Sequence, residues 1–332
     1  MVLSIVIINY NSKSVLINCL RSIVQSNFNF KYEVFIIDNA SSESIHELEK
    51  EFNLFRFIYN QANIGFAGAN NIGIKKAAGK YILLLNPDTI VNRHSFQPMI
   101  NYLDSNPDVG AAGCKIFNSA GEIERSVHSF PSIIKEFVHA NEFIKPLLSY
   151  NSKLGKVFAS NKNLKAFESY WNYDTVKEVD HVTGACMMVK REVIDKAGLL
   201  DEAFFIYNEE VEWSLRFKHY GYKTVFLPES NIIHLFGYST KQKVQKQAVN
   251  RLLVERYRGM LYFFQKHYGV IKLCLLRVII LEGFAVRLLL NYAKTVSPVF
   301  NNEKTNLINE RTCLYKIIKL VFMSDFDWRK NK

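Results

Sequence analysis

Acidic and amide side chains follow the apolar stretches in the first part of the chain, where they could bind a metal ion or a phosphate. In YILLLNPDTI (81–90), a run suited to a buried strand passes directly into Asn86, Pro87 and Asp88. A turn would explain this ending, and so would a carboxylate placed at the end of a strand as a hard oxygen ligand. Pro87 fixes its own φ near about −65° and helps to aim Asp88. This stretch alone leaves both interpretations open.

Three earlier apolar stretches, 3–9, 32–39 and 54–60, also end in polar residues, and helical patterns separate them. Near-continuous apolar strands that alternate with helices are typical of a mostly parallel sheet with helices on both faces, so we expect an α/β fold. Ligands of such sheets bind beyond the carboxyl ends of the strands. We therefore expect a polar cluster at one edge of the sheet. Its members follow the strands: Asn9-Tyr10-Asn11, Asp38-Asn39, Asn63 to Gly65, and Asn86 to Asp88.

A second polar group begins a predicted amphipathic helix over 209–220 and consists of Glu209, Glu210 and Glu212. The positive end of the helix dipole stabilises acidic side chains, so a solvated helix start would explain these three. A carboxylate in this place could instead remove a proton as a general base. Two short strands, KTVFLP and NIIHLF, are expected after the helix.

Positive charge is concentrated in the last quarter of the chain. Residues 1–240 have a net charge of −1, and residues 241–332 have a net charge of +12. A neutral body with a cationic tail favours a polyanionic partner, either a membrane surface or a nucleic acid. In the tail the cations alternate with long apolar residues rather than with aromatic stacking residues, and no nucleic-acid-binding motif occurs. We therefore expect an anionic membrane surface and no nucleic acid.

The apolar stretch GVIKLCLLRVIILEGFAVRLLL (269–290) is nearly long enough to span a bilayer. Charged residues interrupt it every five positions, and no charge-free run approaches the ~18 residues of a spanning helix. We therefore expect helices that lie on a surface. Packing on the rest of the chain, or a homodimer through these helices, remains an alternative.

Several classes of protein are disfavoured. Five scattered cysteines, an odd number with no CxxC pair, argue against a disulfide framework and favour a reducing compartment. The first residues, MVLSIVIINYN, are interpreted as a strand and not as a signal peptide. The absence of GxGxxG after the first strand and of GxxxxGK[ST] disfavours a dinucleotide dehydrogenase and a P-loop NTPase.

A family resemblance accounts for these features together. VIINYNSKSVLINCLRSI, VFIIDNASSES, NQANIGFAGANNIGI, YILLLNPDTIV and TGACMMVKREVIDKAGLLDEAFFIYNEEVEWSLR…GYKTVFLPESNIIHLFG follow one another in this order. Together they resemble the inverting family 2 glycosyltransferases with the GT-A fold. The resemblance extends in particular to bacterial rhamnosyltransferases and related galactofuranosyltransferases of surface-polysaccharide synthesis, and it covers about 1–240.

The resemblance implies a role for each part of the polar edge. Asp38 and the Asn9-Tyr10-Asn11 loop would bind the base or ribose of the donor, although Asp38 could simply cap the next helix. The loop with Asn63, Gly65 and Asn70 would lie beside the nucleotide, although an ordinary tight turn has the same composition. Gly184 and Ala185 would line the pocket for the donor sugar.

The resemblance also implies a metal site and a general base. Asn86 and Asp88 stand in the place of the DxD motif, so Asp88 would bind Mg²⁺ or Mn²⁺ with His234 as the second protein ligand. Asn86 replaces the first acid of that motif, and a lone His on an apolar strand is often only a core residue. Glu210 matches the usual catalytic Asp and would be the base, with Glu209 and Glu212 as runners-up.

The implied reaction moves rhamnose or a similar hexose from a dTDP- or UDP-linked donor to a saccharide or polyprenyl-diphosphate-linked acceptor, with inversion, in the synthesis of O-antigen, capsule or other surface polysaccharide. No Q-x-x-R-W motif occurs, so transfer of one or a few sugars is expected. The alternatives are a galactofuranosyl- or other hexosyltransferase of the same fold, and a catalytically degenerate membrane scaffold.

The expected organisation is a catalytic domain over 1–240 and a helical tail over 241–332. Within the domain, 1–105 would bind the nucleotide and 106–240 the acceptor, with an insertion near 119–178 where the pattern is weak. The expected location is the cytoplasm, with the chain held peripherally on the cytoplasmic face of the membrane.

Overall fold

The computed structural model describes residues 1–141, 172–235, 246–296 and 304–331. The chain divides into two compact units. The first comprises Met1–Phe130, Tyr170–Phe205 and Glu209–Lys243, and the second comprises Pro131–Ser169, Ile206–Asn208 and Val244–Lys332. The predicted boundary near residue 240 and half of the predicted insertion lie outside the described residues, so the predicted domain division stays a prediction.

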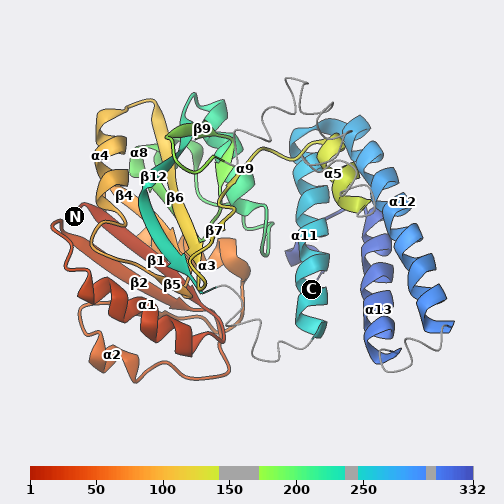
Figure 1. Ribbon diagram of the computed structural model, residues 1–332, viewed down its shortest axis with the longest axis horizontal. Coiled ribbons are helices and arrows are strands. Elements are labelled where there is room, and N and C mark those ends of the chain that lie inside the picture. Colours follow the sequence, from red (N-terminus) through yellow and green to blue (C-terminus); the bar gives the residue numbers. More distant parts are fainter. Residues whose placement is uncertain (142–171, 236–245, 297–303, 332) are drawn as a thin grey trace. The chain divides into compact units, whose positions relative to one another are not determined.

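A ten-stranded, mostly parallel sheet forms the first unit (Figure 1). The strands lie in the order β3-β2-β1-β4-β11-β6-β12-β5, with β7 paired to β6 and β9 to β12, and β8 and β10 form a separate pair. Their bounds are β1 Leu3–Asn9, β2 Tyr32–Asp38, β3 Arg56–Tyr59, β4 Tyr81–Leu85, β5 Thr89–Ile90, β6 Val109–Asn118, β7 Ile123–Glu124, β8 Val127–His128, β9 Lys177–Val179, β10 His181–Val182, β11 Cys186–Lys190 and β12 Lys223–His234. Strands β1 to β4 are parallel, so their carboxyl ends share one edge, while β11 runs antiparallel to β4 and β6.

Helices cover both faces of this sheet, which confirms the predicted fold class. The helices of the first unit are α1 Lys13–Gln25, α2 Leu48–Glu51, α3 Gly65–Lys76, α4 Gln97–Ser105, α8 Arg191–Ala197 and α9 Glu209–His219. Strand β1 shows why two cores form. Its seven residues are all buried, Ile5 and Ile7 pack with α1 and α4, and Val6 and Ile8 pack with α3, α8 and α9. Successive side chains of a strand point to opposite faces, so one apolar run serves both layers.

Two predicted elements differ from the structure. The helix expected around Leu48 is only α2, four residues long. The two strands expected after α9 are one strand, β12, whose pairing with β6 shifts register between Leu227 and Asn231. Pro228 lies in this interval and has no N–H to donate to the ladder. The proline therefore produces a bulge where the sequence suggested a break.

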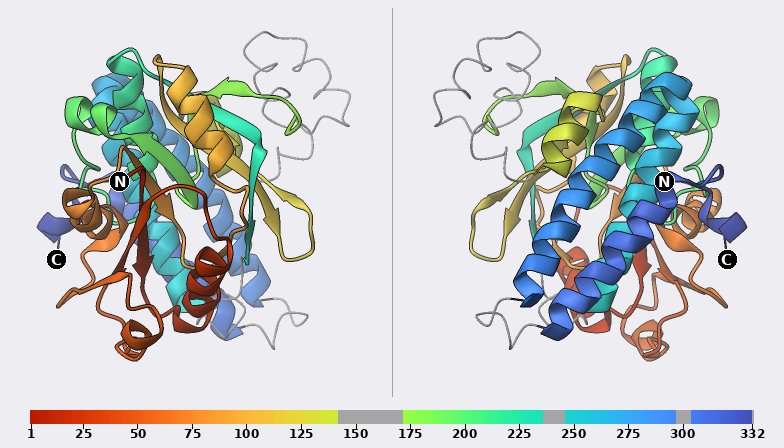
Figure 2. Two further views of the ribbon diagram at one scale, coloured as in Figure 1. Left: turned by 90° about the vertical axis from the view of Figure 1, so that its left-hand side faces the viewer. Right: turned by 90° about the vertical axis from the view of Figure 1, so that its right-hand side faces the viewer.

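The second unit consists mainly of helices (Figure 2). They are α5 Ile133–Ala140, α11 Lys246–His267, α12 Gly269–Val296 and α13 Lys304–Val321, with a 3-10 turn η2 Trp328–Asn331. Buried residues of the three long helices include Phe264, Ile280 and Ile317, and the rings of Tyr257 and Phe284 meet edge-on with centroids 4.9 Å apart. Among the described helices, none is both long enough and apolar enough to cross a membrane.

Candidate functional site

The ends of β1 and β2 carry a hydrogen-bonded polar group. Asn9 and Asp38 are register partners, and both side chains are buried. Asn9 Nδ2 donates to Asp38 Oδ1 at 2.7 Å, and the Ser41 N–H donates to Asp38 Oδ2 at 3.1 Å. A carboxylate can accept about four hydrogen bonds, so both oxygens keep capacity for a ligand. The capping interpretation and the binding interpretation of Asp38 are therefore compatible.

The loop after β1 is tied to the loop after β2. Asn11 has φ +53° and its Oδ1 accepts hydrogen bonds from both the N–H and the hydroxyl of Ser42. Between Asn9 and Asn11, the side chain of Tyr10 is 48% exposed. An exposed aromatic ring at the end of a parallel sheet is suited to stack on a nucleotide base.

Asn39, which was predicted at the polar edge without a role of its own, organises the neighbouring loop. Its amide donates to Asn63 Oδ1 at 2.9 Å and accepts from the backbone N–H of Ile64 at 3.1 Å. Gly65 follows with φ +83°, and a Cβ there would lie 2.5 Å from the carbonyl oxygen of Phe205. The residue must therefore be glycine because two chain segments cross at this point.

Asn70 and Asn86 are held by backbone contacts near this edge. In α3, Asn70 Nδ2 donates to the carbonyl of Phe66, while its buried Oδ1 has no partner among the described residues. The N–H of Asn86 donates to the carbonyl of Ala185 at 3.0 Å. A Cβ on Gly184 would meet only the ring of Phe66, at 3.6 Å. Gly184 is therefore not required by packing, unlike Gly65.

Asp88 and His234 are neighbours although they are far apart in the sequence. Thr89 of β5 is the register partner of His234 in β12, and the N–H of Leu235 donates to the carbonyl of Asp88 at 2.7 Å. As a result Asp88 Oδ1 lies 3.2 Å from His234 Nε2. On the other side of the ring, His234 Nδ1 lies 3.0 Å from Glu124 Oε2.

Glu124 is a residue that the sequence analysis missed. It lies in the short strand β7 and is partly buried, and its neighbour His234 is buried. Burial opposes protonation of His234, but hydrogen bonds and charges of Asp88 and Glu124 outweigh it and raise the pKa of the imidazole. The three side chains form a line of carboxylate, imidazole and carboxylate.

This line fits a divalent cation. A carboxylate oxygen and an imidazole nitrogen facing each other are ligands that Mn²⁺ accepts. Metal-binding histidines usually give their other ring N–H to a carboxylate, which is the position of Glu124. The described residues contain no group of three or more His, Cys, Asp or Glu side chains arranged for a metal ion. Further ligands would have to come from the substrate and from water.

A second acidic pair begins α9. Glu209 is 3% exposed, and the carboxyl groups of Glu209 and Glu210 share a hydrogen bond. Burial, and then the charge of Glu210, raises the pKa of Glu209 well above its usual range. Burial also raises the pKa of Glu210, while backbone N–H groups and the hydrogen bond from Glu209 act to lower it. A hydrogen bond between two carboxyl groups needs a proton on one of them, so the raised pKa values favour a pair that shares one proton.

One carboxyl oxygen of each residue in this pair is buried without a hydrogen bond to a residue that the structure describes. Glu209 Oε2 and Glu210 Oε2 are buried and have no hydrogen-bond partner among the residues that the structure describes. Such acceptors are costly unless a ligand or water completes them. The fully buried Glu212 differs, because its carboxylate accepts a hydrogen bond from Arg216 at 2.8 Å. Arg216 also bonds the carbonyls of Ala197 and Leu199, so Glu212 belongs to a structural network.

The geometry agrees with the comparison to known proteins. The model of "Glycosyl transferase family 2" matches residues 4–198. The chain belongs to this family. The match contains the ends of β1, β2 and β4 and the Gly184-Ala185 pair, but it stops before Glu210 and His234.

Proteins named as sugar transferases are similar in sequence to this chain. The chain is 27% identical over 218 residues to the low-salt glycan biosynthesis hexosyltransferase Agl10 of Haloferax volcanii, covering 64% of this chain and 61% of the relative. It is 24% identical over 219 residues to the N-acetylglucosaminyl-diphospho-decaprenol L-rhamnosyltransferase of Mycobacterium tuberculosis, covering 62% of this chain and 67% of the relative. The chain thus spans about three fifths of the first relative and about two thirds of the second.

Two solved structures share the fold of this chain. The mannosyltransferase PcManGT of Pyrobaculum calidifontis, in complex with GDP-Man and Mn²⁺, superposes with a TM-score of 0.53 at 14% identity, covering 97% of this chain and 88% of that one. GalNAc-T7 with UDP, GalNAc and Mn²⁺ gives the same TM-score at 16% identity, covering 94% and 55%. These likenesses confirm the predicted GT-A fold.

Proposed function

We propose that this protein transfers a hexosyl residue, rhamnose or a similar sugar, from a nucleotide-diphospho-sugar to a saccharide or lipid-linked saccharide during the synthesis of a surface glycan. The observation that carries the proposal is the meeting of Asp88 and His234, 3.2 Å apart, at the end of β4 in a family 2 chain. Relatives named as a hexosyltransferase and a rhamnosyltransferase support the class of reaction.

The donor nucleotide is assigned to the ends of β1 and β2. Asp38 accepts hydrogen bonds from ribose hydroxyls or from the N–H of a uracil or thymine, the exposed ring of Tyr10 stacks on the base, and Asn11 holds the loop in place. Both dTDP- and UDP-linked sugars carry such an N–H. Gly184 and Ala185 border the sugar, since their small side chains let it approach the backbone.

Asp88 and His234 would hold the divalent cation, with Glu124 orienting the imidazole. Such a cation neutralises negative charge on a departing diphosphate. Support comes from the donor set itself and from Mn²⁺ in the two solved structures that share the fold. Asn86 contributes a neutral amide where the DxD motif has an acid, so the protein supplies one charge fewer.

Glu210 is the proposed general base. Its carboxylate takes the proton of the acceptor hydroxyl as that oxygen attacks the anomeric carbon. The bond from this carbon to the diphosphate breaks on the opposite side, and the configuration inverts. We assign the shared proton of the pair to Glu209, which then donates a hydrogen bond to Glu210 and holds it in place. Without a Q-x-x-R-W motif, one or a few sugars are added and the product is released.

The acceptor and the location are proposed from the tail and the relatives. A polyprenyl-diphosphate-linked saccharide suits both the rhamnosyltransferase relative and the cationic last quarter of the chain. Such an acceptor places the enzyme on the cytoplasmic face of a membrane. The alternative of a degenerate, non-catalytic scaffold is motivated by Asn86 and by Glu in place of Asp at position 210.

The deciding experiment is a panel of UDP-, dTDP- and GDP-hexoses with Mn²⁺, with and without a chelator, read by thermal unfolding and by release of the free nucleotide. One donor is expected to stabilise the protein by about 2.7 kcal/mol at a hundred times its Kd, and only with the metal. Asp88→Ala should lose both signals. A protein that binds a donor but never releases nucleotide is the scaffold, and a protein that binds none of the panel contradicts the proposal.

A further inference from the structure

An exposed apolar stripe runs along α12. Ile271 is 76% exposed, Val278 62% and Leu289 71%. Leu289 lies 18 positions after Ile271, which is five complete turns, and Val278 lies about 20° from both around the helix axis. The opposite side of α12 carries the buried Leu276 and Ile280. The helix therefore packs on one side and presents apolar side chains to solvent on the other.

A second exposed stripe runs along α13, beside α12 (Figure 2). Ile308 and Tyr315 lie seven positions apart in α13, and Phe322 follows the last residue of the helix; the three side chains are 55%, 49% and 75% exposed. A hydrogen bond of 2.8 Å between the hydroxyls of Tyr292 in α12 and Tyr315 in α13 joins the two helices. We call this surface, made of Ile271, Val278, Leu289, Ile308, Tyr315 and Phe322, the outer face.

Cations border the outer face. Lys272 follows Ile271, and Lys316 and Lys319 lie beside Tyr315 on α13, all three exposed. None of these lysines has an ion pair with a residue that the structure describes. The acids of the same two helices are engaged, because Glu282 accepts from Asn141 at 3.0 Å and Glu310 accepts from Asn291 at 3.0 Å. The outer face therefore combines exposed apolar side chains with a positive rim.

We propose that the outer face docks on the anionic surface of a lipid bilayer, with α12 and α13 lying along that surface. Apolar side chains would enter the boundary between headgroups and acyl chains, and the lysines would meet lipid phosphates. A second copy of the chain is a poorer occupant, because a two-fold contact would bring the same lysines against each other. The inference rests on the proposed function only for its purpose, which is to bring the site to a lipid-linked acceptor.

Vesicle binding of the full chain tests the proposal without any donor or acceptor. We expect binding to phosphatidylcholine vesicles with about one third phosphatidylglycerol to be at least ~tenfold stronger than to phosphatidylcholine alone. The preference should shrink as salt is raised from about 0.05 to about 0.5 M, because screening shortens the reach of exposed charges.

The apolar part is tested by Ile271→Glu/Val278→Glu, which should weaken binding to the anionic vesicles at least ~tenfold. The matched control is Val24→Glu/Leu54→Glu in the first unit. Its side chains are 53% and 88% exposed, so it loses the same kind of surface and the same charge. The control should bind as the original chain does. Circular dichroism and thermal unfolding should be unchanged in both variants, since all four positions face solvent.

The cationic part is tested by Lys272→Gln/Lys316→Gln/Lys319→Gln, which should abolish the preference for anionic vesicles while leaving weak binding to neutral ones. The control, Lys31→Gln/Lys75→Gln/Lys76→Gln, removes three exposed lysines of the first unit.

Three results would overturn the proposal: no preference of the original chain for anionic vesicles, equal loss in the variants and their controls, or release of the chain from vesicles by duplex DNA at equal charge. Light scattering tests the other possible occupant of the outer face, a second copy of the chain. A dimer that Ile271→Glu/Val278→Glu converts to a monomer, with no vesicle binding, would make the outer face a contact between copies. Donor binding measured on the same samples separates failure here from failure of the proposed function.

Discussion

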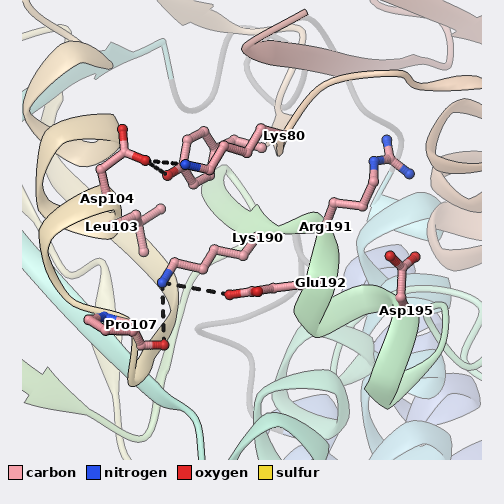
Figure 3. Close-up of a pocket in the computed structure, with 9 residues that line it drawn as sticks. Lys80, Leu103, Asp104, Pro107, Lys190, Arg191, Glu192 and Asp195 are labelled. Atoms are coloured by element: carbon pink, nitrogen blue, oxygen red, sulfur yellow. Dashed lines mark hydrogen bonds and ion pairs between the residues drawn. The ribbon is translucent and has the colours of Figure 1, made fainter.

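The two edges of the large sheet are both rich in charged side chains, but they use these charges differently. At the amino end of β4, a cavity of about 450 Å³ is lined by Lys80, Asp104, Lys190, Arg191 and Glu192, among others (Figure 3). At the carboxyl end lie the Asp88–His234 pair and the polar ends of β1 and β2. This cavity is at the first edge, whereas the candidate chemistry is at the second, where Ile90 and Ile233 border another cavity of about 470 Å³.

At the amino edge, the charged side chains form hydrogen bonds with other groups of the protein. Lys190 is 5% exposed, and its Nζ donates to the carbonyls of Asn106 at 2.9 Å and Pro107 at 3.4 Å. Arg191 donates to the carbonyls of Gly79 and Ala77 at 2.8 and 2.6 Å. These cations satisfy backbone carbonyls where α3 and α4 have ended, in the way that basic side chains stabilise helix ends. This network holds the fold together.

In α3 and at the start of α9, some hydrogen-bond acceptors have no partner among the described residues, and Asn70 Oδ1 is one of them. Glu209 Oε2 and Glu210 Oε2 are buried without a partner among the described residues. The contrast teaches that a polar cavity is not by itself a functional site. A candidate site is distinguished by hydrogen-bond acceptors that the protein itself does not use, because leaving them buried and unpaired lowers its stability.

The largest expected effect comes from removing the base at the start of α9. Glu210→Gln should lower the rate of sugar transfer about 10²- to 10⁴-fold, because general base catalysis typically contributes that much. Donor affinity should change little, since the amide keeps the size of the side chain. The assay is nucleotide release with the donor that the panel identifies. The control is Glu192→Gln at the amino edge, which should leave the rate unchanged, and equal loss in both variants would contradict the comparison of the two edges.

A smaller effect, a loss of metal affinity, is expected when Glu124 is changed. Glu124→Gln removes the charge that orients His234, and it should weaken Mn²⁺ binding about 10- to 100-fold. The measurement is the affinity for Mn²⁺ by electron paramagnetic resonance in the presence of donor, which does not depend on turnover. Glu178→Gln, a change of the same kind in β9, serves as control. Unchanged Mn²⁺ affinity would show that Glu124 only stabilises β7.

Changing Lys190 should separate stability from function. Lys190→Met removes the two hydrogen bonds that the buried Lys190 Nζ donates to the carbonyls of Asn106 and Pro107, and we expect it to lower the free energy of unfolding by about 1–2 kcal/mol. Chemical denaturation measures this loss. Transfer per folded molecule should remain as in the original chain, and a fall in that rate would place function at the amino edge. The exposed Lys75→Met is the control for loss of a lysine.

The sequence predicts some parts of the candidate site for reasons that are local. Asn9, Asp38 and Asp88 follow uninterrupted apolar strands, and parallel pairing alone brings the strand ends together. Glu124 could not be found in this way. It lies in a two-residue strand within a weakly patterned segment, and its partner His234 is 110 positions away.

The family resemblance supplied what local patterns could not. His234 lies on an apolar strand where a core residue is the ordinary interpretation, and only the resemblance marked it as a ligand. Asn39 was predicted only as a polar strand end, because an amide after a strand is ordinary turn chemistry and its contacts to Asn63 and Ile64 depend on how two loops pack. Pro228 misled the strand prediction because a bulge and a break have the same local signal.

The subtlest expected effect distinguishes the two members of the acidic pair. The pKa of Glu209 is raised above its ordinary value of 4.5, so the native state holds a proton that the unfolded chain loses. The free energy of unfolding therefore falls as pH rises above about 4.5, by at most about 1.4 kcal/mol per pH unit for one proton, until the raised pKa is passed.

Glu209→Gln should flatten this slope, because the amide does not titrate. The amide still donates a hydrogen bond to Glu210, so sugar transfer should stay within about threefold of the original rate, in contrast to the loss in Glu210→Gln. Denaturant unfolding from about pH 4.5 to about pH 8, together with nucleotide release, measures both quantities. If Glu209→Gln abolishes transfer and Glu210→Gln does not, the roles of the two residues are exchanged. If neither does, the open acceptors at the start of α9 do not take part in the reaction.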